Sequence, residues 1–137
     1  MITDITIYET QTGRILQSGN CGSDSVDAQV YDKEKYSLIE LASNPYEDYI
    51  SNDTYVIKRI NQDTTLSKLT LIADGIDIIT VSNCPNGLFT ARNKITNEII
   101  VGNISSTDTF STTILGTYQI KIESFPYLDF EATIEAT

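Results

Sequence analysis

Two segments near the end of the chain alternate apolar and polar residues with almost no error. The first runs Tyr118-Gln119-Ile120-Lys121-Ile122-Glu123, and the second extends from Leu128 to Ala136. Because successive side chains of a β-strand point to opposite faces, this alternation predicts strands with one buried face and one solvated face. Such strands are typical of a small β-sandwich, which more often presents a surface than a catalytic cleft.

The same rhythm extends back to about residue 66, where short β-prone segments alternate with turn signals. We expect strands at Leu69–Ala73, Ile76–Ser82, Phe89–Asn93, Ile99–Ile104, Thr109–Leu115, Thr117–Ser124 and Leu128–Ala136. The expected separators are Asp74-Gly75, Pro85-Asn86-Gly87, Thr96-Asn97, Ser105-Ser106, Gly116 and Phe125-Pro126. About seven strands with a turn roughly every 8–12 residues are typical of an immunoglobulin-like sandwich. Tyr118 has two interpretations: it forms a tyrosine corner, or it is a core aromatic residue.

The first part of the chain has the pattern of a separate small module. One hairpin is expected from Ile5–Tyr8 and Arg14–Leu16 around Gln11-Thr12-Gly13, and a second from Asp48–Ile50 and Tyr55–Arg59 around Ser51-Asn52-Asp53. Between them we expect helical turns at Ser23–Gln29 and a strand at Ser37–Leu41. The sequence therefore predicts an all-β protein: a two-hairpin N-terminal module in residues 1–62, then a seven-stranded immunoglobulin-like β-sandwich in residues 63–137.

The composition argues against several classes of partner. The chain has 137 residues, of which 19 are acidic and 9 basic, and its formal net charge is -10. A field of that sign repels phosphate, so we expect no nucleic-acid binding, whereas a cation or a basic partner stays open. No apolar run approaches the roughly 20 residues that span a bilayer. No secretory signal is visible either, so we expect synthesis in a cytoplasm and no membrane partner.

The residues that usually carry enzyme chemistry are missing. The chain has no histidine and no glycine-rich phosphate loop, so we predict neither an enzyme nor a cofactor. Two carboxylate pairs, Asp74/Asp77 and Glu47/Asp48, could act as acid and base or bind Ca²⁺, but Asp74–Asp77 is better interpreted as a turn. A calcium loop of the DxDxDG type is absent, and no metal site is predicted.

The two cysteines and the tyrosines leave alternatives open. Cys21 and Cys84 have no CxxC or metal spacing, so free thiols are expected, with a disulfide between the two halves as the alternative. The tyrosines of the N-terminal module either pack its sheets, form a protein interface or stack on carbohydrate. Phe125 and Tyr127 around Pro126 are either a surface for sugars or a packed strand corner.

Four segments, in order along nearly the whole chain, carry a resemblance to a known family: Tyr8–Ile15, Tyr49–Arg59, Ile72–Val81 and Gly116–Leu128. The third is similar to an "ADGxDxxTV" start of an immunoglobulin-like module, and the last to a closing "GTYxVxxExFPYL" signature. Together they resemble small proteins encoded among the tail genes of tailed bacteriophages. The second hairpin departs from this family because its turn has no glycine, and Asn83–Gly87 differs from the usual "GLPxG" loop.

The resemblance implies a non-enzymatic virion component, synthesised in the host cytoplasm and associated with the tail or a tail fibre. Its N-terminal module would dock to a larger virion protein through strand edges and tyrosines, and the sandwich would project outward. A capsid decoration protein and a module that binds carbohydrate or the host surface through Phe125 and Tyr127 are the alternatives. Self-association in the particle also stays open. The expected docking tyrosines are Tyr8, Tyr46, Tyr49 and Tyr55.

Overall fold

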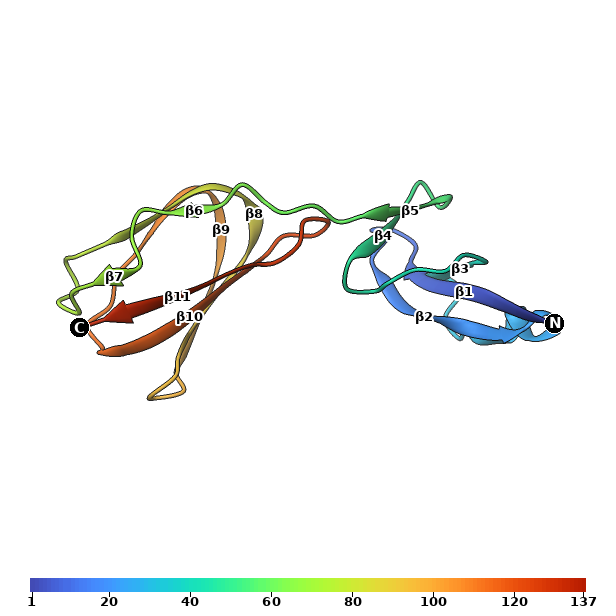
Figure 1. The fold of residues 1–137 in the computed structure, drawn as a ribbon, viewed down its shortest axis with the longest axis horizontal. Coiled ribbons are helices and arrows are strands. Elements are labelled where there is room, and N and C mark those ends of the chain that lie inside the picture. Colours follow the sequence, from blue (N-terminus) through green and yellow to red (C-terminus); the bar gives the residue numbers. More distant parts are fainter. The chain divides into compact units, whose positions relative to one another are not determined.

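Strands dominate the computed structural model, which describes residues 1–137 and contains one short helix. The expected all-β class is confirmed. The chain divides into two units, residues 1–59 and residues 60–137. The first unit contains β1 to β5 and the second contains β6 to β11 (Figure 1). The division falls at Arg59/Ile60, whereas the sequence pattern suggested residue 62.

The first unit contains both expected hairpins. β1 (Ile2–Glu9) pairs antiparallel with β2 (Ile15–Gly22), and β3 (Tyr36–Ile39) pairs with the other edge of β1. The expected helical turns form a 3-10 helix, η1 (Ser23–Gln29). β4 (Asp48–Ser51) and β5 (Tyr55–Lys58) make the second hairpin. Its turn closes without glycine because Asn52 and Asp53, both at φ 54°, adopt the left-handed conformation that Asn and Asp tolerate.

The two hairpins of the first unit meet at Gly13 and Ile50. The N–H of Ile50 donates to the carbonyl of Gly13 at 2.8 Å. Gly13 has φ 79°, and a Cβ at this position would lie 1.9 Å from the Ile50 oxygen, so the contact requires glycine. Beside it, Tyr8, Ile15 and Ile50 form the buried core of the unit.

The second unit is built around two long strands. β8 (Ile79–Asn93) pairs antiparallel with β9 (Ile99–Phe110) over their full lengths. Pro85-Asn86-Gly87 and Ser105-Ser106 therefore lie inside strands, and the prediction that they are turns was wrong. The pairing register shifts on either side of Cys84, and Asn83 and Ser106 have positive φ, so the chain bulges and bends at these points without ending the strands.

The bend lets β8 pair with different neighbours along its length. Its first part pairs with β6 (Thr65–Leu66), and its second part pairs with β10 (Gly116–Glu123). β10 pairs antiparallel with β11 (Phe130–Ala136), which in turn pairs in parallel with β7 (Thr70–Leu71). All six strands thus belong to one continuous hydrogen-bonded sheet.

The core of the second unit confirms the alternation that the sequence showed. Tyr118, Ile120 and Ile122 of β10 are buried, whereas Gln119 and Glu123 are exposed. The residues that meet in the main cluster come from β7, both parts of β8, the end of β9, β10 and β11: Leu71, Ile79, Ala91, Phe110, Tyr118, Ile120, Ile134 and Ala136.

Tyr118 satisfies both of its interpretations. Its ring is 1% exposed in the core, and its hydroxyl donates to the carbonyl of Ile114 at 2.9 Å while bonding the hydroxyl of Thr112 at 2.8 Å. A tyrosine hydroxyl bonded back to the backbone a few residues upstream is a tyrosine corner. It fixes the connection between β9 and β10.

Candidate interaction surfaces

Tyr8 is part of the core of the first unit. Its ring is buried against Ile15 and Ile50, and its hydroxyl donates to the carboxylate of Asp53 at 2.9 Å. Burial, followed by the bond to Asp53, raises the pKa of the Tyr8 phenol. Its position in β1 places the ring of Tyr8 in the core, as the packing interpretation of the tyrosines expects, and partner contact through Tyr8 stays a prediction.

Tyr49 and Tyr55 share the outward face of the β4–β5 hairpin. Ile50 and Val56 are paired across the hairpin and face the core, so the alternate pairs Tyr49/Ile57 and Ser51/Tyr55 face away from it. Tyr55 is 61% exposed, and Tyr49 is half-buried. This face is the part of the first unit where aromatic and aliphatic side chains are presented together on a strand pair.

Tyr46 lies at the other end of the same hairpin, in a turn that acidic and amide side chains hold. Asn44 Oδ1 accepts the N–H of Tyr46 at 2.9 Å, and Asp48 accepts the N–H of Asn44 at 2.8 Å. The other oxygen of Asp48 pairs with Lys58 Nζ at 3.0 Å, and this bond is the main cause of the raised pKa of Lys58. Tyr46 itself is 84% exposed. The tyrosines predicted for docking therefore do not form a single patch.

Phe125 and Tyr127 lie in the connection between β10 and β11. Both rings are half-buried. The N–H of Tyr127 donates to the carbonyl of Ser124 at 2.8 Å, which tightens this corner. A platform for sugar stacking needs an open ring face. The partial burial of these rings favours the packed-corner interpretation.

The carboxylates of Asp74 and Asp77 form hydrogen bonds and an ion pair with neighbouring groups. Asp74 accepts the N–H groups of Ile76 and Asp77, each at 2.8 Å, and these bonds lower the pKa of the Asp74 carboxyl. Asp77 pairs with Lys68 and accepts the N–H of Ile72, and the lysine is the main cause of the lowered Asp77 pKa. The Asp74–Asp77 turn is thus confirmed, and no group of three or more His, Cys, Asp or Glu is placed to hold a metal ion.

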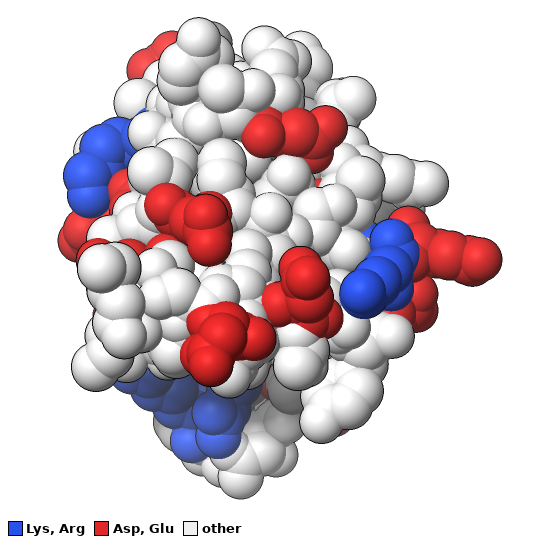
Figure 2. All heavy atoms as spheres, turned by 90° about the vertical axis from the view of Figure 1, so that its right-hand side faces the viewer, with Lys and Arg blue, Asp and Glu red and all other residues white.

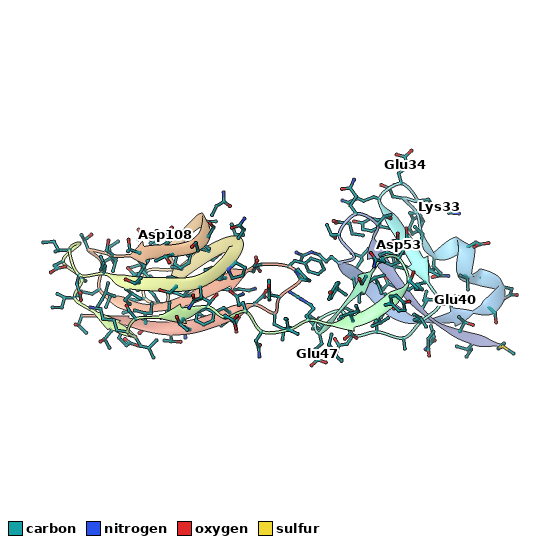
Figure 3. The ribbon with its side chains drawn as sticks, turned by 90° about the horizontal axis from the view of Figure 1, so that it is seen from above. Lys33, Glu34, Glu40, Glu47, Asp53 and Asp108 are labelled. Carbon is teal, nitrogen blue, oxygen red and sulfur yellow. The ribbon has the colours of Figure 1, made fainter.

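A groove of about 670 Å³ lies beside β3 in the first unit. Its lining includes Val26, Leu38 and the charged residues Asp27, Lys33 and Glu40. Figure 3 labels Lys33 and Glu40, and Figure 2 shows carboxylates scattered over the face that it draws. The mixed charges of the groove do not select one class of ligand.

The second unit has an apolar edge that the sequence pattern did not single out. β9 pairs with β8 alone, and Ile99 and Val101 are 58% and 60% exposed. Beneath it lies a cavity of about 290 Å³, whose lining includes Phe89, Ile100 and Phe110. No sequence signal indicates this edge, because the segment from Ile99 to Thr107 carries none of the charged residues that commonly protect an edge strand.

The two cysteines are free thiols in different units. Cys21 of β2 is half-buried, whereas Cys84 of β8 is buried, and its burial raises the pKa of its thiol. No helix of the protein has the length and apolar character needed to cross a membrane. Comparisons with models of protein families, with curated proteins and with solved structures find no match for this chain.

Proposed function

We propose that this chain is a non-enzymatic structural component of a tailed-phage virion, associated with the tail or a tail fibre. The first unit docks it to a larger virion protein, and the second unit is an immunoglobulin-like β-sandwich that it presents. The observation that carries the docking role is the outward face of the β4–β5 hairpin, where Tyr55 is exposed beside the exposed Ile57. Aromatic rings on a regular strand pair supply large contact area with little loss of side-chain entropy.

Three further features support the immunoglobulin-like assignment of residues 60–137. β6 pairs with the first part of β8, whereas β7 pairs in parallel with β11. The short segment that contains β6 and β7, residues 65–71, therefore contributes to two parts of the sheet. β10 lies between β11 and the second part of β8. The tyrosine corner at Tyr118 is a hallmark of such sandwiches.

The docking role is tested with tyrosine variants in phage particles. The double variant Tyr46→Ala/Tyr55→Ala should lower the copy number of the protein per particle at least tenfold, because truncating interface aromatics commonly costs about 1–2 kcal/mol each. Tyr31→Ala is the control, since Tyr31 is an exposed tyrosine of the same unit that lies outside the hairpin. Unchanged incorporation of the double variant, measured by immunoblotting of purified particles, would refute docking through this hairpin.

A further inference from the structure

The cavity of about 290 Å³ in the second unit lies within the bend of β9. Its lining comes from both sides of the bend, residues 100–104 and residues 108–111, and from Val81 and Phe89 of β8. Ser106, between the two parts of β9, has φ 63°, and the pairing register with β8 shifts at this point. Bulges re-aim the side chains on either side of them. The bend therefore places residues of a single strand around one cavity.

Most of the cavity wall is aromatic or aliphatic. Phe89 and Phe110 contact each other with their ring centroids 6.0 Å apart, and Ile100 and Ile104 also line the space. The face of a phenylalanine ring attracts cations as well as apolar groups. The volume lies at the small end of the roughly 300–1,000 Å³ that is usual for ligand pockets. The cavity thus has room for one apolar group of about the size of a large side chain.

Asp108 is the only charged residue in the lining, and it is labelled on β9 in Figure 3. It pairs with Val81 of β8, and residues paired across two strands lie on the same side of a sheet. Because Val81 is 1% exposed, this side is the core side, on which the cavity also lies. One oxygen of the Asp108 carboxylate accepts the N–H of Thr109 at 2.8 Å, and no lysine or arginine side chain pairs with Asp108. The apolar cavity therefore has one negative group beside it that lacks a cationic partner.

We propose that this cavity binds an organic cation, whose apolar body lies against Phe89 and Phe110 and whose ammonium or guanidinium group pairs with Asp108. Charge complementarity selects this class of ligand: the net charge of -10 concentrates cations near the surface, whereas an anion is repelled both by this field and by Asp108. A free amine has this chemistry, and so has a lysine or arginine side chain of another protein, with its apolar stem and cationic end. The inference does not rest on the proposed function.

Titrations of the full chain followed by NMR test the cavity directly, with benzylammonium as the cationic probe and benzyl alcohol as its uncharged counterpart. Benzylammonium should shift the methyl signals of Ile100 and Ile104 and the ring signals of Phe110, with a Kd of about 1 mM, as expected for so small a ligand. At low salt it should bind about fivefold more tightly than benzyl alcohol, because only the ammonium group pairs with Asp108. Added salt should reduce this preference, since it screens the ion pair.

Two matched variants separate the role of Asp108 from that of the net charge. Asp108→Asn keeps an oxygen that can accept the N–H of Thr109, and it should remove the preference for benzylammonium while leaving the binding of benzyl alcohol unchanged. Glu98→Gln is the control, because Glu98 is an exposed acidic residue just before β9 that does not line the cavity. It removes the same charge from the chain and should keep the preference.

A second pair of probes distinguishes the two sources of the cation. A tripeptide with a central arginine represents a protein side chain, and the same tripeptide with citrulline is its uncharged counterpart. Tighter binding of the arginine tripeptide than of benzylammonium would assign the cation to a partner protein, and the reverse order would assign it to a free amine. Equal affinity of the charged and uncharged probes, an equal loss of preference in Glu98→Gln, or no shifts of the cavity residues at about 10 mM probe would each overturn the proposal. Asp108 would then serve only to discourage a further strand from pairing with β9.

Discussion

Replacing Gly13 with alanine is expected to unfold the first unit selectively, because Gly13 is the point where its two hairpins touch. A Cβ at this position would lie 1.9 Å from the carbonyl oxygen of Ile50, well inside any real contact distance. The backbone of the alanine would also have to adopt φ 79°, in the left-handed region. Neither problem can be relieved by rotating a side chain, since the opposing atom belongs to the backbone.

The size of the effect follows from these contacts. The left-handed conformation costs an alanine about 1–2 kcal/mol. Moving β4 away breaks the 2.8 Å hydrogen bond from Ile50 to Gly13, which contributes about 1 kcal/mol. It also separates Ile50 from Tyr8 and Ile15 in the core. We therefore expect a loss of about 3 kcal/mol or more, against a total of roughly 3–9 kcal/mol for a unit of this size.

Hydrogen exchange, combined with denaturant unfolding, measures this loss directly. Amides of Tyr8, Ile15 and Ile50 should lose protection in Gly13→Ala. Gly19→Ala is the control, because Gly19 lies in β2 without positive φ and no atom lies within 4 Å of a Cβ there. Gly19→Ala should change stability by less than about 1 kcal/mol. Equal stability of the two variants would show that the contact between the hairpins is not what holds the unit together.

Three other substitutions or measurements test separate parts of the structure. Asn93 is fully buried, and its side chain bonds the N–H groups of Ile95 and Thr96 and the carbonyl of Leu115, so Asn93→Ala should destabilise the second unit by about 2–4 kcal/mol in thermal unfolding. Because folding raises the pKa of Tyr8 above its unfolded value of 10.0, the contribution of the protonated phenol to stability is fully present below pH 10.0 and should be lost as pH rises from there through the folded pKa. Tyr8→Phe should therefore lose less stability at alkaline pH. A thiol reagent at neutral pH should modify Cys21 faster than Cys84, and equal rates would contradict the burial of Cys84.

The parts of the fold that the sequence predicted well are those that local patterns determine. The alternation in β10 and β11 reports which residues are buried, because one face of each strand is covered along its whole length. The turn at Asp74–Asp77 depends on bonds between neighbours, which the residue types already indicate. Both N-terminal hairpins likewise follow from strand-forming segments around turn residues.

Other features depend on contacts between distant residues, which local patterns do not report. Pro85-Asn86-Gly87 looks like a turn, but pairing with β9 holds the chain extended through a bulge. Tyrosine is a residue type that is common at interfaces, and only the packing of Tyr8 against Ile15 and Ile50 shows that it belongs to the core. The exposed edge of β9 results from strand order, which the sequence of β9 does not reveal.

The copy number of this chain in purified phage particles tests the proposed function most directly. Quantitative mass spectrometry against the major capsid protein gives this number without any variant. A handful of copies per particle is the result that the account predicts for a tail component. Copies comparable to the capsid protein would instead indicate a head decoration protein, and absence of the chain from particles would contradict the assignment to the virion.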